Sequence, residues 1–163
     1  MVTVLLVLLG VAAADVGDVR ASAEVALSGE AITSALSDFS RWEALFPSDC
    51  VAKVAVGEPS AGEGARARLT YTPGPMRRRL TAVVKVVEPG RRVDVDHDGN
   101  KGFVTRFMIG DSEGETRQVT AQTYINPPPW PLRAMYYNKV VPAWEACYRA
   151  ALERLEGGSA STP

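Results

Sequence analysis

The side chains best suited to hold a small molecule are aromatic residues spread along the second half of the chain and near its first helices. An aromatic ring buries about 150–250 Å², and a buried phenol needs a hydrogen-bond partner. We expect most of these rings to be ordinary core. The residues that a sheet and a helix aim at one shared space are the candidates to line a ligand cavity: Trp42, Leu69, Tyr71, Phe107, Trp144 and Tyr148. Trp130, which lies between prolines, and Tyr137 are the candidates for a gate.

His97 is the only histidine in the chain. An imidazole titrates near neutrality and can act as a general acid or base. Alternation places it on the same side as Val93 and Val95, but it also lies at a strand end within Asp-His-Asp-Gly. We therefore expect a solvated loop histidine. No motif pairs a serine or cysteine nucleophile with a base, so we assign no catalytic residue.

Cys50 and Cys147 are the only cysteines. In an oxidising compartment they can form a disulfide if their Cα atoms lie within about 7 Å, a distance that the sequence does not set. Cysteine is also among the residue types most often buried, and we expect two unpaired core cysteines. With no CxxC pair and a single histidine, we expect no metal site and no cofactor.

A basic run, Arg77 to Arg79, follows a Pro-Gly-Pro turn. We interpret it as the solvated end of a hairpin, with contact to anionic lipid head groups as the alternative. Trp130 would suit the same membrane interface, because tryptophan favours that zone. Arg68 and Arg106 lie on predicted strands, and they would face a carboxylate ligand only if the strand register were opposite to the one we assign.

The spacing of apolar residues predicts the elements that position these side chains. Alternation predicts a first strand over residues 20–27 and a further series of strands after residue 50. That series comprises residues 51–56, 65–71, 79–88, 91–98, 103–109 and 119–125. Short turns rich in glycine and proline join them, and such links favour antiparallel neighbours.

Helical spacing predicts the remaining elements. A helix over about residues 28–39 and a second short helix that ends at Pro47 follow the first strand. The longest helix runs over about residues 132–156, with one continuous apolar stripe. Pro142 lies inside it, and we expect this residue to bend the helix or to mark the start of its regular part.

The first residues differ in character from the rest of the 163-residue chain. Residues 1–14 hold no charged side chain and end in three alanines. This pattern is typical of a secretory signal peptide, although no basic residue precedes the apolar run. We expect a periplasmic or secreted protein if the segment is cleaved, and a membrane-anchored one if it is not. Residues 15–157 then form one domain and residues 158–163 a disordered tail.

The order of elements, together with the segment Asp38–Pro47 (DFSRWEALFP), resembles the START-related SRPBCC superfamily in its polyketide cyclase/dehydrase and lipid-transport branch. Residues 62–64, 88–93 and 116–120 add to a resemblance that spans about residues 19–156. It implies an α+β helix-grip fold, in which a curved antiparallel sheet of about six to seven strands wraps on a long C-terminal helix, with two short helices after the first strand. It also implies a cavity between sheet and helix.

The function that we expect is the binding of an apolar or aromatic small molecule, such as a lipid, a quinone or a polyketide-like compound, by a non-catalytic carrier or sensor. One alternative is an aromatase/cyclase for polyketide-type substrates, which an export signal disfavours. Another is a protein-interaction module of the coenzyme-Q-binding or ribosome-associated kind. The partners expected are a hydrophobic ligand and, transiently, a membrane. The net charge of −1 gives no reason to expect nucleic acid, and the oligomeric state stays open.

Overall fold

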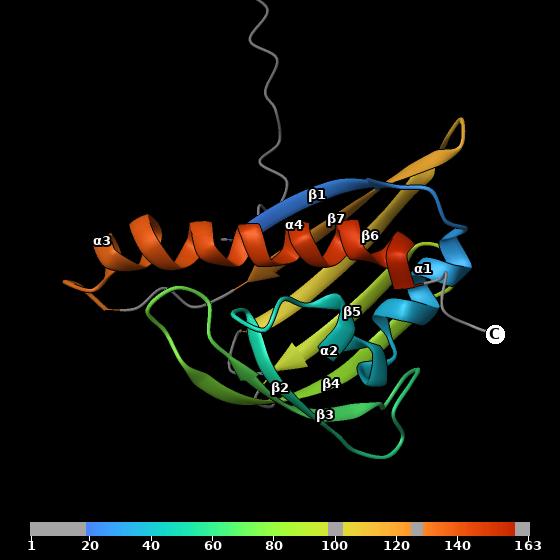
Figure 1. The fold of residues 1–163 in the computed structure, drawn as a ribbon. Helices are drawn as coiled ribbons and strands as arrows, with labels where there is room; N and C mark the ends of the chain where they lie inside the picture. The colour runs from blue at the N-terminus through green and yellow to red at the C-terminus, as the bar shows by residue number, and fades with distance from the viewer. Residues whose placement is uncertain (1–18, 98–102, 125–128, 159–163) are drawn as a thin grey trace, which may run out of the picture.

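A curled seven-stranded antiparallel sheet forms the body of the protein, with strand order β1-β7-β6-β5-β4-β3-β2. The computed structural model describes residues 19–97, 103–124 and 129–158. Figure 1 shows the sheet curving around one long C-terminal helix, which confirms the predicted helix-grip fold. The strands are β1 (Val19–Val25), β2 (Val51–Val56), β3 (Arg66–Tyr71), β4 (Arg78–Glu88), β5 (Arg92–His97), β6 (Phe103–Glu113) and β7 (Thr116–Tyr124).

Alternation along the strands sets which side chains enter the core. On β3, Leu69 and Tyr71 are buried on the inner face, while Arg68 is exposed on the outer face. Arg68 therefore follows the register that we assigned. β2 departs from simple alternation because its register shifts between Val51 and Lys53. Alternation placed Ala52, Val54 and Val56 on one side of this strand, but Val51 is the buried residue there and Val56 is 44% exposed.

Three short helical segments follow β1: α1 (Gly29–Leu36), η1 (Phe39–Arg41) and α2 (Trp42–Leu45). The Ser28 hydroxyl caps α1 by accepting a hydrogen bond from the backbone N–H of Ala31 at 3.2 Å. The helix packs closely on the β4–β5 turn, where a Cβ atom on Gly29 would lie 2.8 Å from the Cα of Gly90. Only glycine allows this approach, which fixes α1 against one end of the sheet.

The C-terminal helix has three parts: α3 (Arg133–Met135), a π-helical stretch η2 (Tyr136–Val140) and α4 (Val141–Gly158). Pro142 stands at the start of α4, so it marks the beginning of the regular helix, as one of our two predictions stated. α4 runs along β1, an edge strand of the sheet. Carboxylates on α4 accept hydrogen bonds from two backbone N–H groups of this part of the chain: Glu145 from Arg20, and Glu156 from Ala26.

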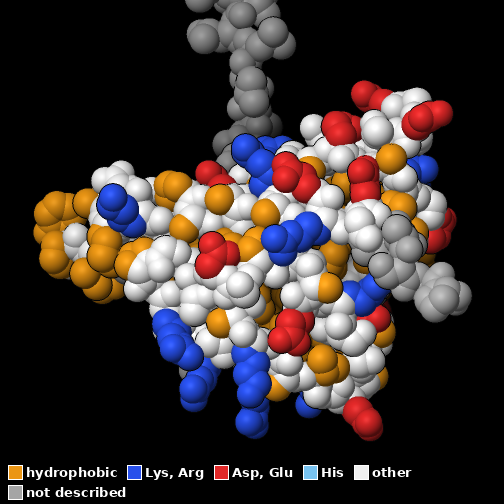
Figure 2. Space-filling view, in the orientation of Figure 1, with side chains coloured by type: hydrophobic (Ala, Val, Ile, Leu, Met, Phe, Trp, Pro, Cys, Tyr) orange, Lys and Arg blue, Asp and Glu red, His pale blue; other side chains and the backbone are white. Residues whose placement is uncertain are grey.

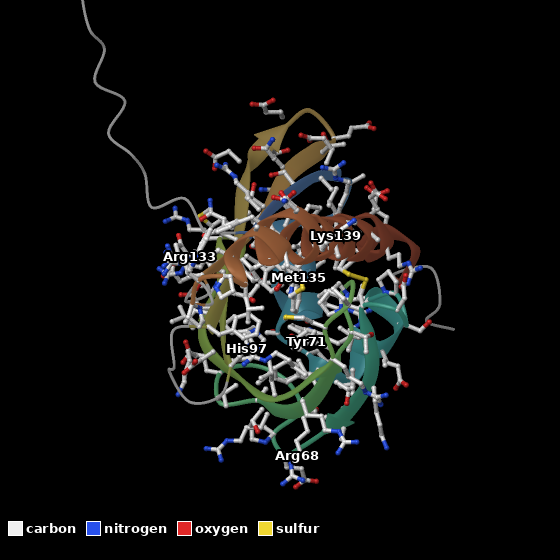
Figure 3. The ribbon with its side chains drawn as sticks, turned by 90° about the vertical axis from the view of Figure 1, so that its left-hand side faces the viewer. Arg68, Tyr71, His97, Arg133, Met135 and Lys139 are labelled. Atoms are coloured by element: carbon white, nitrogen blue, oxygen red, sulfur yellow. A yellow bond between two sulfur atoms is a disulfide. The ribbon has the colours of Figure 1, made fainter. Side chains whose placement is uncertain are left out.

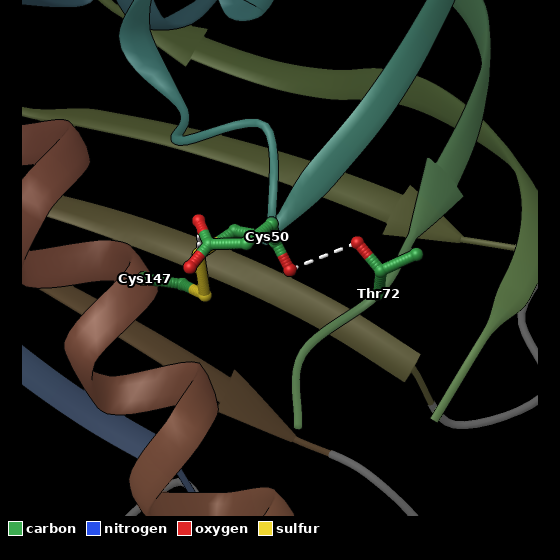
Figure 4. The surroundings of a disulfide bond; sticks show 4 residues. Cys50, Thr72 and Cys147 are labelled. Carbon is green, nitrogen blue, oxygen red and sulfur yellow. Dashed lines mark hydrogen bonds between the residues drawn. A yellow bond between two sulfur atoms is a disulfide. The ribbon is translucent and has the colours of Figure 1, made fainter. Parts of the chain in front are cut away.

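A disulfide joins α4 to the opposite edge of the sheet. Cys50 directly precedes β2, the other edge strand, and its sulfur is bonded to that of Cys147 with the Cα atoms 5.7 Å apart (Figure 4). The Thr72 hydroxyl donates to the carbonyl of Asp49 at 2.8 Å and steadies the same corner. Our expectation of unpaired core cysteines was wrong, because the fold brings together two residues that lie 97 positions apart. The helix is thus fastened to both edges of the sheet.

The expected signal peptide (residues 1–14) and residues 159–163 of the expected tail lie outside the described residues. Among the helices that the structure does describe, none combines the length and the apolar character that a membrane span requires.

Candidate functional site

The inner face of the sheet and the helix enclose a continuous chain of aromatic rings. All six residues predicted to line a cavity are buried there, each at most 2% exposed. Five of them form a series of ring contacts from Trp42 through Phe107, Tyr148 and Trp144 to Tyr71, with centroids 4.7–6.3 Å apart. Leu69 lies beside Tyr71 on the inner face of β3. The structure therefore brings the predicted residues together, and their contact with a ligand stays a prediction.

One end of this interior holds a residue that we misplaced. His97 is fully buried, because β5 is paired with β4 and β6 up to its last residue. Its ring stacks on Phe103 at 4.2 Å and meets the edge of Tyr71 at 5.7 Å. The prediction of a solvated loop histidine is wrong, although alternation had placed it inward. Phe103 also contacts Trp144 at 5.9 Å, so these four rings form one group.

Three hydroxyl groups form a buried cluster beside His97. The hydroxyls of Thr105, Thr123 and Tyr148 are hydrogen-bonded to one another in a triangle with sides of 3.0, 3.0 and 2.8 Å. Thr105 is also 3.1 Å from Nε2 of His97. Sequence reasoning missed both threonines, and the available signal was a polar residue on an otherwise apolar face: Thr105 lies between Phe103 and Phe107 on β6.

The number of protons in this cluster determines the tautomer of His97. Three hydroxyls supply three protons, and the three bonds of the triangle use all of them. The fourth bond, between His97 and Thr105, must therefore be donated by the imidazole Nε2–H. Nδ1 of the neutral ring then carries a lone pair. That atom is buried and has no hydrogen-bond partner.

A second buried polar atom in the same ring group also lacks a partner. It is Nε1 of Trp144, which can only donate. A buried polar atom left without a hydrogen bond costs about 1–3 kcal/mol. The four-ring group thus presents one unused acceptor, on His97, and one unused donor, on Trp144. These two atoms could bind a hydroxyl and a carbonyl group of a ligand.

Burial holds the titratable groups of this interior in their neutral forms. Desolvation lowers the pKa of His97 to about 3. It raises the pKa of Tyr148 to about 12, against the opposing effect of the hydrogen bonds with Thr105 and Thr123. The pKa of Tyr71 is raised well above its ordinary value, also chiefly by desolvation. An anionic group would find no positive charge on these three side chains.

On the outer face of the sheet, the charges around Asp94 are paired. Asp94 accepts hydrogen bonds from the guanidinium groups of Arg92 and Arg106. Burial would raise the pKa of Asp94, but these bonds and the two positive charges hold it below its ordinary value. Arg106 is therefore occupied on the outer face, as the assigned register predicted. In the parts of the chain that the structure describes, no three side chains of His, Cys, Asp or Glu converge as metal ligands would.

The two residues predicted to form a gate lie near the beginning of the C-terminal helix. Trp130 is 81% exposed and Tyr137 is 44% exposed. Figure 3 looks toward this end of the molecule, where Met135 of α3 lies above Tyr71 and His97. The end of the interior that holds the unused polar atoms therefore lies below the first turns of the helix. A gating role for Trp130 and Tyr137 stays a prediction.

The fold and the aromatic interior define a START-like helix-grip protein. The family model described as "Polyketide cyclase / dehydrase and lipid transport" matches residues 17–157, and the chain belongs to this family. No curated protein matches the chain.

Solved structures show the same fold at low sequence identity. The KanY protein is 17% identical with a TM-score of 0.72, over 87% of this chain and 96% of that one. A norcoclaurine synthase from Thalictrum, solved with a transition-state analogue, is 14% identical with a TM-score of 0.60, over 88% and 95%. A START superfamily protein from Mycobacterium smegmatis is 19% identical with a TM-score of 0.55, over 84% and 97%. Similarity at this level supports the fold alone.

Proposed function

We propose that the protein binds an apolar or aromatic small molecule, such as a lipid, a quinone or a polyketide-like compound, between the sheet and α4, and carries or senses it without chemical change. Family membership supports a hydrophobic ligand. The observation that carries the proposal is the pair of buried polar atoms without partners, Nδ1 of His97 and Nε1 of Trp144, among aromatic rings. A neutral ligand with a hydroxyl and a carbonyl group would satisfy both of them.

The pKa values of the interior favour a carrier over a polyketide cyclase. A general acid or base works best when its pKa is close to the operating pH. His97, with a pKa of about 3, is too weak a base, and Tyr148, with a pKa of about 12, is too weak an acid. These groups can orient a ligand by hydrogen bonding but are poorly suited to move its protons.

Native mass spectrometry of the purified protein tests the binding. We expect a retained apolar molecule that organic extraction removes and that rebinds afterwards. The Trp144→Phe substitution keeps an aromatic side chain, though a smaller one, and removes the donor, so we expect about tenfold weaker rebinding, as the loss of one hydrogen bond of about 1.4 kcal/mol implies. The control is Arg149→Gln, at an exposed position of α4 outside the interior and the predicted gate, which should rebind normally. A folded protein that retains nothing and takes up no fatty acid, quinone or polyphenol would contradict the proposal.

We also propose that the protein is exported and that it meets a membrane transiently when it collects or delivers its ligand. The Cys50–Cys147 disulfide supports export, because disulfides persist mainly in oxidising compartments. Sequencing the N-terminus of the protein recovered from the secreted or periplasmic fraction tests it. We expect the mature chain to begin at Asp15, after the three alanines. A chain that keeps Met1 and stays with the membrane fraction would indicate an anchor instead.

A further inference from the structure

A basic groove lies on the outer face of the sheet, away from the aromatic interior. It has a volume of about 640 Å³ and is formed by β2, β3 and β4. Four cationic side chains line it, and no Asp or Glu does; the cations are Lys53, Arg68, Arg77 and Arg79. We call this cavity, with its four cationic side chains, the basic groove. Figure 2 shows Lys and Arg side chains projecting together from the lower edge of the molecule, below the strands β3 and β4 of Figure 1.

The strand register explains how the charges come together. Thr70 on β3 lies opposite Lys53 on β2 and opposite Arg79 on β4, so the two cations flank one threonine. Arg68 faces the same side two residues earlier on β3. Among the described residues none of the four cations forms a salt bridge. Like charges held at this spacing repel one another, and an anion bound between them would relieve that repulsion.

The groove is not the result of a generally basic protein. The chain has 18 Lys and Arg against 19 Asp and Glu. The grouping of four cations without a carboxylate is therefore local to this groove, and it indicates an anionic partner.

An exposed apolar cluster lies at the adjacent end of the molecule. It consists of Trp130, Leu132, Met135 and Tyr137, each between 44% and 81% exposed, and we call it the apolar tip. Together with Val56 these are the large apolar side chains most exposed in the described part of the chain. In Figure 2 hydrophobic residues gather at the left-hand tip, and Lys and Arg side chains project from the lower edge of the same view. Tryptophan, tyrosine and flanking basic residues are the combination that favours a membrane–water interface.

The β3–β4 loop connects the two features. A Cβ atom on Gly74 would lie 3.2 Å from the carbonyl oxygen of Lys139 and 3.3 Å from the Cβ of Ala143. The loop therefore packs directly on the helix that carries the apolar tip. Arg77 follows Gly74 by three residues, and Tyr137 precedes Lys139 by two. This contact holds the loop that leads to Arg77 against the helix whose first turns carry the apolar tip.

We propose that the basic groove and the apolar tip together form a docking surface for a membrane rich in anionic lipids. The tip inserts its apolar side chains at the level of the head groups, and the groove binds lipid phosphates. The Met135 side of the interior would then face the bilayer. Docking would give an apolar ligand a route between the bilayer and the interior. In this respect the proposal rests on the proposed carrier function. The docking itself can be tested separately, with protein that holds no ligand.

Co-sedimentation of the extracted protein in its expected mature form, which begins at Asp15 and lacks the apolar residues 1–14, with vesicles tests the docking. We expect firm binding to vesicles of phosphatidylcholine and phosphatidylglycerol at about 7:3, and weak binding to phosphatidylcholine alone. Each basic residue at such a surface contributes about 1 kcal/mol, so Arg68→Gln with Arg79→Gln should weaken binding about 30-fold. Trp130→Ser should also weaken it, and 0.5 M salt should remove most of the dependence on anionic lipid.

The matched control is Arg149→Gln with Arg154→Gln, which removes the same charge from exposed positions further along α4. It should bind as the wild type does, and circular dichroism should show every variant folded. Equal binding by the groove variant and the wild type would overturn the proposal, as would the absence of binding to anionic vesicles. Competition by millimolar glycerol phosphate, or binding to heparin in place of vesicles, would also overturn it by assigning the groove to a soluble anion.

Discussion

Reduction of the Cys50–Cys147 disulfide is expected to lower the free energy of unfolding by about 2–5 kcal/mol. The bond closes a loop of 97 residues, and the chain entropy that it removes from the unfolded state increases with loop length. Both cysteines are buried in the folded protein, and the disulfide is part of the packed interior. A loss of this size is a large part of the 5–15 kcal/mol that holds a typical domain folded.

Urea unfolding followed by circular dichroism, with and without reductant, measures this loss. Cys50→Ala with Cys147→Ala is the matched control, because it should unfold at the lower urea concentration in both conditions and should not respond to reductant. A count of free thiols confirms that the wild type was reduced. Superimposed wild-type curves at full reduction would show that the disulfide adds nothing to stability.

The disulfide also has a consequence for ligand retention. α4 is hydrogen-bonded along β1 at one edge of the sheet, and it is joined to β2 at the other edge through Cys50 and Cys147. Without this link the helix keeps its packing, the β1 contacts and the buried hydrogen bonds of Tyr148 with Thr105 and Thr123. β2 is an edge strand with one strand neighbour. After reduction of the disulfide, we therefore expect the interior to open first on the β2 side, which is where a retained ligand would escape.

Hydrophobic periodicity predicted the elements and their order, since most strands show their buried face as alternation and the C-terminal helix shows a long stripe, and the family resemblance supplied their arrangement as a helix-grip fold. It failed where the backbone leaves the regular pattern. The register shift in β2 places Val51, and not Val56, in the core. Periodicity carries no information about such a shift, which depends on the pairing with β3.

The candidate site was predictable in its rings but not in its polar chemistry. The aromatic residues were found because the alternation of the strands and the helical spacing of the C-terminal segment direct side chains into the same interior. His97 was misassigned because its acidic neighbours suggested solvent, whereas the register sends Asp96 to the other side of β5 and His97 inward. The cysteines were misassigned because their proximity is created by tertiary structure alone. The polar atoms that lack a partner are determined by the complete hydrogen-bond network of the folded protein. A local sequence pattern cannot predict them.

The burial of His97 predicts an unusual dependence of stability on pH. Its pKa is about 3 in the folded protein and 6.5 when solvated. Between these values the unfolded chain binds a proton that the folded chain does not, so the free energy of unfolding falls as the pH decreases. From pH 7 to pH 4 this single residue should remove about 3 kcal/mol, and no loss from it is expected above about pH 7.5.

The His97→Gln substitution isolates this contribution. Glutamine keeps an N–H that can donate to Thr105, but it has no proton to gain in this range. We expect the variant to be less stable than the wild type at pH 7, because it loses the stacking on Phe103, and the difference should shrink as the pH falls to 4. Carboxylates such as Asp94 titrate in both proteins and cancel in the comparison. A constant difference across this range would mean that His97 has the same pKa in the folded and the unfolded chain.

Proton NMR provides an independent reading of the same prediction. Since the chain has one histidine, its ring signals need no assignment by mutation. They should keep a constant chemical shift from pH 8 to pH 5 in the folded protein, and an inflection near pH 6.5 would place the ring in solvent. The absence of titration would show that the ring stays neutral, which is the condition for Nδ1 to accept a hydrogen bond from the proposed ligand.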